Sequence, residues 1–199
     1  MKSDSIAFGI AGIAFGLIAG WIIGSQQAQS RQPPAQATTS QAPAPANTRA
    51  AVIDDAKVTA LKSVAEREPS NAKPRIDLGN LYFDAERYDD AISWYEAALK
   101  LTPRDVNLST DLGVCYYYTN QPDKALAQFD KSLAIDPKHA KTLLNLGIVR
   151  AFGKQDLAGA TKAWEQVMAI NPNSPEGQAA KRALDTLRSA HGGDTKPGA

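Results

Sequence analysis

Hydrophobic and polar positions recur along the middle of the chain with a period of 34 residues, and each period closes on a proline. In residues 72–105, the recurring positions hold Leu78, Gly79, Tyr82, Ala91, Tyr95, Ala98 and Pro103. In residues 106–139, the same offsets hold Leu112, Gly113, Tyr116, Ala125, Phe129, Ser132 and Pro137. In residues 140–174, they hold Leu146, Gly147, Arg150, Ala160, Trp164, Val167 and Pro172, the last four one residue late. The pattern therefore predicts three copies of one structural unit.

Each copy is predicted to form two antiparallel helices, because its apolar positions fall three or four residues apart on both sides of a polar turn. In the first copy these helices should cover about residues 72–85 and 88–101. In the second copy Pro122 should begin the second helix, since proline is tolerated in the first turn of a helix but not inside one. In the third copy we expect residues 153–156 to form a turn that is longer by the extra residue.

Small residues at two positions of each copy predict where its helices come closest. The eighth position holds Gly79, Gly113 and Gly147, and the twentieth holds Ala91 and Ala125, with Ala160 one residue later in the third copy. We expect these residues to face each other, because larger side chains would force the two helices apart. A single pair cannot bury its apolar face alone, so the copies must stack into one continuous core. The predicted fold class is all-α, a solenoid of helix-turn-helix repeats.

Helices are also expected on both sides of the three copies. Residues 52–71 should hold one of them, and its closing Pro69 lies 34 residues before the first repeat's closing proline. We interpret it as the second helix of an incomplete copy. Residues 175–190 should hold the other, with Ser174 as the N-cap and Pro175 at its first position. Its charged outer face is typical of a helix that caps an array.

The N-terminal part of the chain has a different character. Residues 6–24 are free of charge, and as a helix they would reach roughly 28 Å, close to the hydrocarbon thickness of a bilayer. This predicts one transmembrane helix, and the alternative is a cleaved secretory signal with its cleavage site at residues 28–30. Residues 25–51 are rich in Pro, Ala and Gln and should form a disordered linker. Residues 191–199 should form a disordered tail.

Charges around the predicted transmembrane helix indicate its orientation. The N-terminal tail, residues 1–5, carries Lys2 and the terminal amine against Asp4, and only Arg31 follows closely on the other side. This favours a cytoplasmic N-terminus and an extracytoplasmic repeat array, periplasmic if the source is a Gram-negative bacterium. Small residues recur every four positions on one side of the helix, where a second helix could approach closely. These are Gly12, Gly16, Gly20 and Gly24.

Composition narrows the classes of function. With 22 basic and 21 acidic residues the chain is nearly neutral and has no basic cluster, so nucleic acid is not an expected partner. Cys115 is the only cysteine, and the only histidines, His139 and His191, lack the spacing of metal ligands. No phosphate-binding glycine loop or catalytic set occurs. We therefore expect no cofactor, no metal and no enzymatic activity, and we interpret Cys115 as a buried thiol.

The recurring residues resemble the tetratricopeptide repeat: Leu-Gly-x2-Tyr, then an alanine, an aromatic residue four positions later, and a proline. The resemblance covers residues 72–174. The chain departs from it at Arg75, Ser109 and Leu143, where the family often has tryptophan, and at Arg150, which replaces an aromatic residue. The resemblance implies a right-handed superhelix in which the first helix of each pair lines a concave groove that holds a peptide.

The resemblance also implies the groove positions, which are the second, fifth, ninth, twelfth and thirteenth of each first helix. Among them we expect the following to bind peptide: Ile76, Asn80, Phe83, Thr110, Val114, Tyr117, Tyr118, Lys141, Leu144, Ile148 and Phe152. The remaining positions are polar or small: Lys73, Asp84, Asn107 and Ala151. Grouped aromatic residues in a groove favour a partner with apolar anchors. Since three consecutive tyrosines, residues 116–118, point three ways around a helix, at least one of them must enter the core.

One variant of the family grips a C-terminal carboxylate with a set of Lys and Asn side chains. Only Asn80 and Lys141 match that set here, and Ile76, Asp111 and Asn145 occupy its other positions. We therefore expect that this chain does not form the carboxylate clamp.

These expectations favour a membrane-anchored scaffold that presents its repeats to peptide segments of partner proteins in cell-envelope assembly. The expected partners are a protein or peptide client and, through residues 6–24, the lipid bilayer. One alternative is a structural membrane protein that forms homo-oligomers through its glycine-spaced helix and the ends of the repeat array, without any client. The order of anchor, tether and repeats also resembles accessory subunits of bacterial c-type cytochrome maturation.

The self-association alternative makes a direct prediction. If the glycine face pairs helices, the full chain should run as an oligomer in mild detergent, and Gly16→Leu with Gly20→Leu should reduce it to a monomer because the leucines keep the helices apart. Light scattering coupled to size exclusion measures both masses. A monomer for both proteins would remove this alternative.

Overall fold

The structure is a computed structural model that describes residues 52–192, with side chains described for residues 52–190. The predicted transmembrane helix at residues 6–24, its four glycines, the linker at residues 25–51 and the end of the tail lie outside the described residues. Among the helices that are described, none combines the length and the apolar character needed to cross a bilayer.

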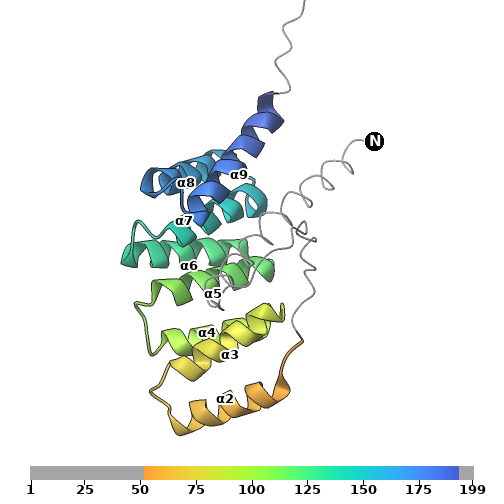
Figure 1. Cartoon of the computed structure of the whole chain (residues 1–199), viewed down its shortest axis with the longest axis vertical. Coiled ribbons are helices and arrows are strands. Elements are labelled where there is room, and N and C mark those ends of the chain that lie inside the picture. Colours follow the sequence, from red (N-terminus) through yellow and green to blue (C-terminus); the bar gives the residue numbers. More distant parts are fainter. Residues whose placement is uncertain (1–51, 193–199) are drawn as a thin grey trace, which may run out of the picture. The chain divides into compact units, whose positions relative to one another are not determined.

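The described residues form eight α-helices and no strand. The helices are α2 (Asp55–Arg67), α3 (Lys73–Asp84), α4 (Tyr88–Leu99), α5 (Val106–Tyr118), α6 (Pro122–Ile135), α7 (Ala140–Ile148), α8 (Leu157–Ile170) and α9 (Pro175–Gly192). Each packs on its neighbours in sequence, and α7 also packs on α5 and α9 (Figure 1). The stack of helix pairs confirms the predicted all-helical solenoid.

The turn inside each helix pair has the same conformation in all three copies. Glu86, Asn120 and Gln155 occupy it with φ of 57°, 59° and 56°, in the left-handed region that few residues other than glycine adopt. The second helix of the pair begins two residues later each time, at Tyr88, Pro122 and Leu157. The turn of the third copy is therefore no longer than the other two, and the expectation that it holds the extra residue is wrong.

The extra residue lies instead at the end of the first helix of the third copy. There α7 continues into η2 (Val149–Gly153), a π-helical turn. The backbone N–H of Lys154 donates to the Val149 oxygen, five residues back, at 3.1 Å. In the second copy Thr119 donates to Cys115, only four residues back. A π-turn absorbs one added residue without ending the helix, so the turn that follows keeps its shape.

The glycine of each copy lies under an aromatic ring of the second helix. A Cβ placed on Gly79, Gly113 or Gly147 would meet first the ring of Tyr95, Phe129 or Trp164, respectively. The sequence predicts that each glycine faces the alanine that lies four residues before this aromatic residue. Those alanines, Ala91, Ala125 and Ala160, are fully buried, but the ring is the nearest group. The close contact of each pair is thus glycine against ring.

Two of the departures from the repeat pattern have structural explanations. The Arg75 guanidinium donates to the backbone oxygens of Ala65 at 3.0 Å and Asn71 at 2.8 Å, and so satisfies carbonyls at the end of α2 and in the following loop. Ser109 is buried and its hydroxyl accepts hydrogen bonds from Gln128 at 2.7 Å and Ser132 at 2.8 Å. Both positions join neighbouring helices by hydrogen bonds where a large ring would fill space.

Gly113→Ala should lower the free energy of unfolding of the full chain by up to about 2 kcal/mol. Its Cβ would lie 2.5 Å from a ring carbon of Phe129, and overpacking a core costs about 1–3 kcal/mol, against a gain of about 1 kcal/mol from removing a helical glycine. Urea denaturation measures the change. The double variant Gly113→Ala with Phe129→Leu should lose less free energy of unfolding than the sum of the two single variants, because the smaller side chain leaves room for the methyl group. A loss equal to that sum would contradict the contact.

Candidate functional site

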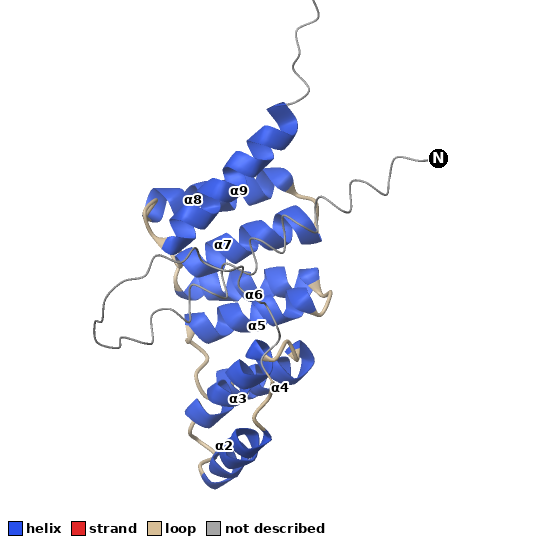
Figure 2. Ribbon diagram, turned by 45° about the vertical axis from the view of Figure 1, so that its right-hand side comes forward, coloured by secondary structure: helices blue, strands red, loops and turns tan. Residues whose placement is uncertain are grey.

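The candidate surface is formed by the first helices of the three pairs, α3, α5 and α7, which follow one another through the stack in Figure 2. Most of the predicted groove residues keep some exposed surface. Asn80 is exposed, and the half-buried ones are Ile76, Phe83, Val114, Tyr117, Tyr118, Lys141 and Phe152. All three consecutive tyrosines are half-buried, and Tyr116 packs against both clusters of the hydrophobic core. The peptide-binding role of these residues stays a prediction.

Three predicted groove residues have almost no surface to offer a peptide. Thr110, Leu144 and Ile148 are 0%, 2% and 4% exposed. The Thr110 hydroxyl lies 2.6 Å from that of Thr142 on α7, so it joins two first helices. Because α5 and α9 both pack on α7, its side chains are enclosed on more sides than the sequence pattern indicates. These three residues belong to the packing of the array.

Aromatic rings meet across the first two copies. We call the four residues Phe83, Tyr88, Tyr118 and Tyr117 the aromatic ladder. The Phe83 ring meets the Tyr88 ring edge to face with 5.5 Å between centroids, and Tyr88 stacks on Tyr118 at 4.5 Å. Tyr117 and Tyr118 are 5.9 Å apart. Tyr88, the first residue of α4, was not among the predicted residues because only first helices were considered.

The aromatic ladder reaches the third copy at the π-turn. A Cβ on Gly153 would lie 3.2 Å from a ring carbon of Tyr117 and 3.1 Å from Cβ of Pro122. Tyr117 therefore lies against the end of η2. The ladder extends from α3 to η2 and links all three helix pairs along the edge that carries their turns.

Burial raises the pKa values of the ladder tyrosines further above physiological pH. It raises the pKa of Tyr118 to about 12, with smaller contributions from Tyr117 and the Glu86 carboxylate. It also raises the pKa of Tyr88 above the ordinary value, helped by Tyr118 and Glu86. All hydroxyls of the ladder thus remain protonated at physiological pH, and the rings present neutral faces with polar edges.

The two residues that match the carboxylate clamp are both engaged within the chain. Lys141 Nζ lies 2.6 Å from Oδ1 of Asp111, and their side chains are only 17% and 26% exposed. The Tyr95 hydroxyl donates to the Asn80 side-chain oxygen at 2.8 Å. Lys141 therefore has a carboxylate partner from α5 in this structure.

We next consider metal-ligating and nucleophilic side chains in the described part of the chain. No group of three or more His, Cys, Asp or Glu side chains there could hold a metal ion. Cys115 is buried, and burial raises the pKa of its thiol, with Asp111 adding to the shift. A thiol held in its protonated form is a poor nucleophile.

A chain of polar side chains joins the second and third copies. His139 Nδ1 lies 2.7 Å from the Thr142 hydroxyl, and Nε2 lies 3.1 Å from Oδ1 of Asn107 on α5. The Thr142 hydroxyl contacts that of Thr110, which donates to the Val106 oxygen at 2.7 Å. His139 is thus a structural link between α5 and the start of α7.

Residues 70–138 match the model of the tetratricopeptide repeat. The match covers the end of the loop between α2 and α3 and nearly all of the first two copies. It supports the resemblance seen in the sequence. No protein of curated function matches the chain in sequence.

Solved structures with tetratricopeptide-like folds superpose on the array. "Crystal structure of MamA protein" has a TM-score of 0.57 at 18% identity over 73% of this chain and 88% of that one. "First TPR of Spaghetti (RPAP3) bound to HSP90 peptide SRMEEVD" has a TM-score of 0.52 at 25% identity over 70% and 97%. The Sgt2 TPR domain from Aspergillus fumigatus has a TM-score of 0.55 at 23% identity over 64% and 86%. These likenesses show the fold.

Stability should fall in mild acid because of His139. Burial lowers its pKa, with Lys141 acting in the same direction and Asp136, Asp111 and Glu176 opposing. A histidine whose folded pKa lies below the unfolded value of about 6.5 binds protons more readily when unfolded, so stability present above pH 6.5 is lost as the pH falls through the folded pKa. The melting temperature of the full chain should therefore decrease from pH 7.5 to 5.

His139→Gln is the matched variant, because it retains polar atoms but has no proton to gain in this range. Its melting temperature should change less between pH 7.5 and 5 than that of the wild type. Equal slopes for both proteins would assign the pH dependence to other groups.

Proposed function

We propose that this protein is a non-enzymatic scaffold that binds a segment of a partner protein along α3, α5 and η2. The observation that carries this is the aromatic ladder, in which half-buried rings from the first two copies meet one another and reach the third. Tyrosine and phenylalanine rings present a large contact area and lose little side-chain entropy on binding. A partner that covers this edge can therefore place apolar side chains against all three copies at once.

The rings are held in place before any partner arrives. Phe83, Tyr88 and Tyr118 fix one another through edge and stacking contacts, and Tyr117 lies against Gly153. A surface that is already ordered avoids the cost of about 0.5–1.5 kcal/mol for each side chain immobilised on binding. The similar RPAP3 structure is described as bound to an HSP90 peptide, which supports peptide binding by a fold of this kind.

The place of this scaffold in the cell is part of the proposal. We infer an anchor at residues 6–24 with the N-terminus in the cytoplasm and the repeats in the periplasm or another extracytoplasmic space. The linker, residues 25–51, reaches up to about 90 Å at roughly 3.3 Å per residue. The array would then meet membrane or envelope proteins at some distance from the bilayer, in the assembly of an envelope complex.

Site-specific photo-crosslinking of the full chain in its native membrane tests this proposal. A photoreactive phenylalanine analogue in place of Tyr117 should give discrete adducts with a partner, because the aromatic side chain it replaces lies in the ladder. The matched control carries the same analogue at Ala127, an exposed position on α6. We expect adducts for Tyr117 and none of the same mass for Ala127. Mass spectrometry identifies what is attached.

The identified partner segment is then measured in purified form. Tyr117→Ala with Phe152→Ala should weaken its binding at least tenfold, because truncation of two aromatic anchors commonly costs more than 1.4 kcal/mol. Circular dichroism must show the variant folded. Undiminished binding by a folded variant, or equal adducts at both crosslinking positions, would overturn the assignment of the surface.

A further inference from the structure

We propose that the aromatic ladder selects a partner segment with an arginine or lysine next to its apolar anchor residues. This deepens the proposed function and rests on it, because it concerns the ligand of the same surface. Carboxylates without an ion pair border the ladder, and the chain already makes two cation–ring contacts close by.

Carboxylates border the ladder. Glu86 occupies the turn between Phe83 and Tyr88, its side chain is exposed, and it has no ion pair within residues 52–190. Its charge acts on the phenols of both Tyr88 and Tyr118, so it lies near the stacked pair. Asp84, at the end of α3, also has no ion pair within residues 52–190. Burial raises the pKa of its carboxyl group, and Lys57 opposes this shift.

Three cations of the repeats are paired with carboxylates of the chain itself. Arg87 pairs with Asp90 at 2.7 Å, and Lys154 pairs with Asp123 at 2.7 Å. Lys141 pairs with Asp111. An incoming acidic segment would compete with these carboxylates for the three cations, whereas an incoming cation finds Glu86 without an ion pair among the described residues. Glu86 therefore complements a basic partner.

Two contacts inside the protein show the same chemistry. The Arg87 guanidinium lies over the Tyr82 ring at 4.9 Å from its centroid while it pairs with Asp90. Lys124 lies over the Tyr116 ring at 5.6 Å, and the Tyr116 hydroxyl donates to Glu96 at 2.6 Å. A cation between a tyrosine face and a carboxylate gains from both. The ladder places the same two groups close together, in the Tyr88 ring and the Glu86 carboxylate.

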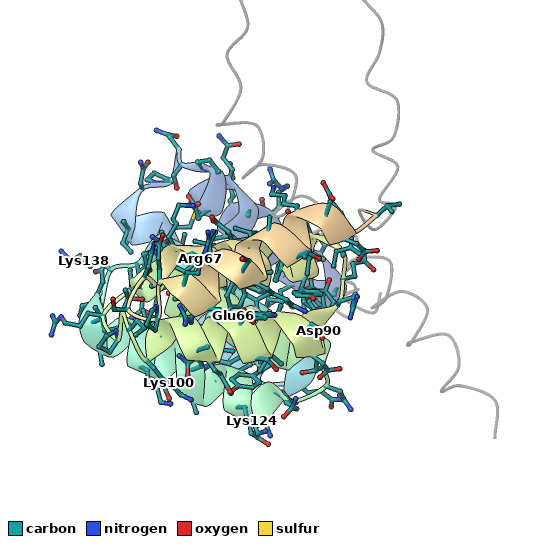
Figure 3. All side chains as sticks on the ribbon, turned by 90° about the horizontal axis from the view of Figure 1, so that it is seen from below. Glu66, Arg67, Asp90, Lys100, Lys124 and Lys138 are labelled. Carbon is teal, nitrogen blue, oxygen red and sulfur yellow. The ribbon has the colours of Figure 1, made fainter. Side chains whose placement is uncertain are left out.

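Acidic residues begin two of the second helices. Figure 3, viewed from the α2 end of the stack, places Asp90 at one side and Lys138 at the other. Asp90 lies in the first turn of α4, two residues after Tyr88, and Lys138 lies in the loop between α6 and α7. Asp123 lies in the first turn of α6, so both aspartates lie where the positive end of a helix favours a carboxylate.

Selection from a library of random 12-residue peptides displayed on phage tests the inference with the full chain in detergent. Peptides selected by the wild type should be enriched in Arg or Lys beside apolar residues. Glu86→Gln keeps the size of the side chain and removes its charge, so the basic enrichment should fall while the apolar preference stays. Glu66→Gln, an exposed position on α2, is the matched control and should select as the wild type does.

A synthetic peptide from the wild-type selection then gives the magnitude. Its dissociation constant should rise about twofold to fivefold for Glu86→Gln, as expected for the loss of one exposed ion pair, and remain unchanged for Glu66→Gln. Selection of neutral or acidic peptides by the wild type, or equal binding by both variants, would overturn this inference and leave the scaffold proposal standing. Absence of any selected peptide, or full binding by a folded Tyr118→Ala, would overturn both.

Discussion

The contact between a glycine and an aromatic ring sets the spacing inside each helix pair, and the rest of the array depends on it. Gly113 lets the Phe129 ring approach the backbone of α5 so closely that even a methyl group would collide. The same contact recurs with Tyr95 and Trp164, rings of three different sizes. The spacing of the helix pair is therefore set by a glycine on one helix and a flat ring on the other. Any of the three aromatic residues can supply that ring.

Periodicity in the sequence predicts the parts of the fold that repeat. A glycine, an alanine and an aromatic residue at fixed offsets can satisfy only one packing arrangement, so the helix pairs and their order followed from the pattern. The extra residue of the third copy was assigned to the turn because loops usually accept insertions. The structure places it in η2 because Gln155 must keep the same left-handed turn as Glu86 and Asn120. Local backbone geometry overrode the general tendency.

The candidate site was less predictable, because surface exposure depends on helices that are distant in the sequence. Leu144 and Ile148 stand at positions of the repeat that line the groove in the family. They are nevertheless buried, because α5 and α9 pack on α7. Tyr88 was missed for a related reason: it belongs to a second helix, and only the stacking on Tyr118 brings it into the surface. A position in a repeat predicts the direction of a side chain on its own helix, but its neighbours decide whether it can be reached.

The π-turn has a consequence for how such arrays diversify. Successive residues on a helix are rotated by about 100°, so one residue added before Lys154 changes which side chains follow Val149 on each face, while the turn and α8 keep their places. The scaffold and the surface it displays can thus vary separately. A single inserted codon can redraw the binding face of one repeat and leave the packing of the others intact.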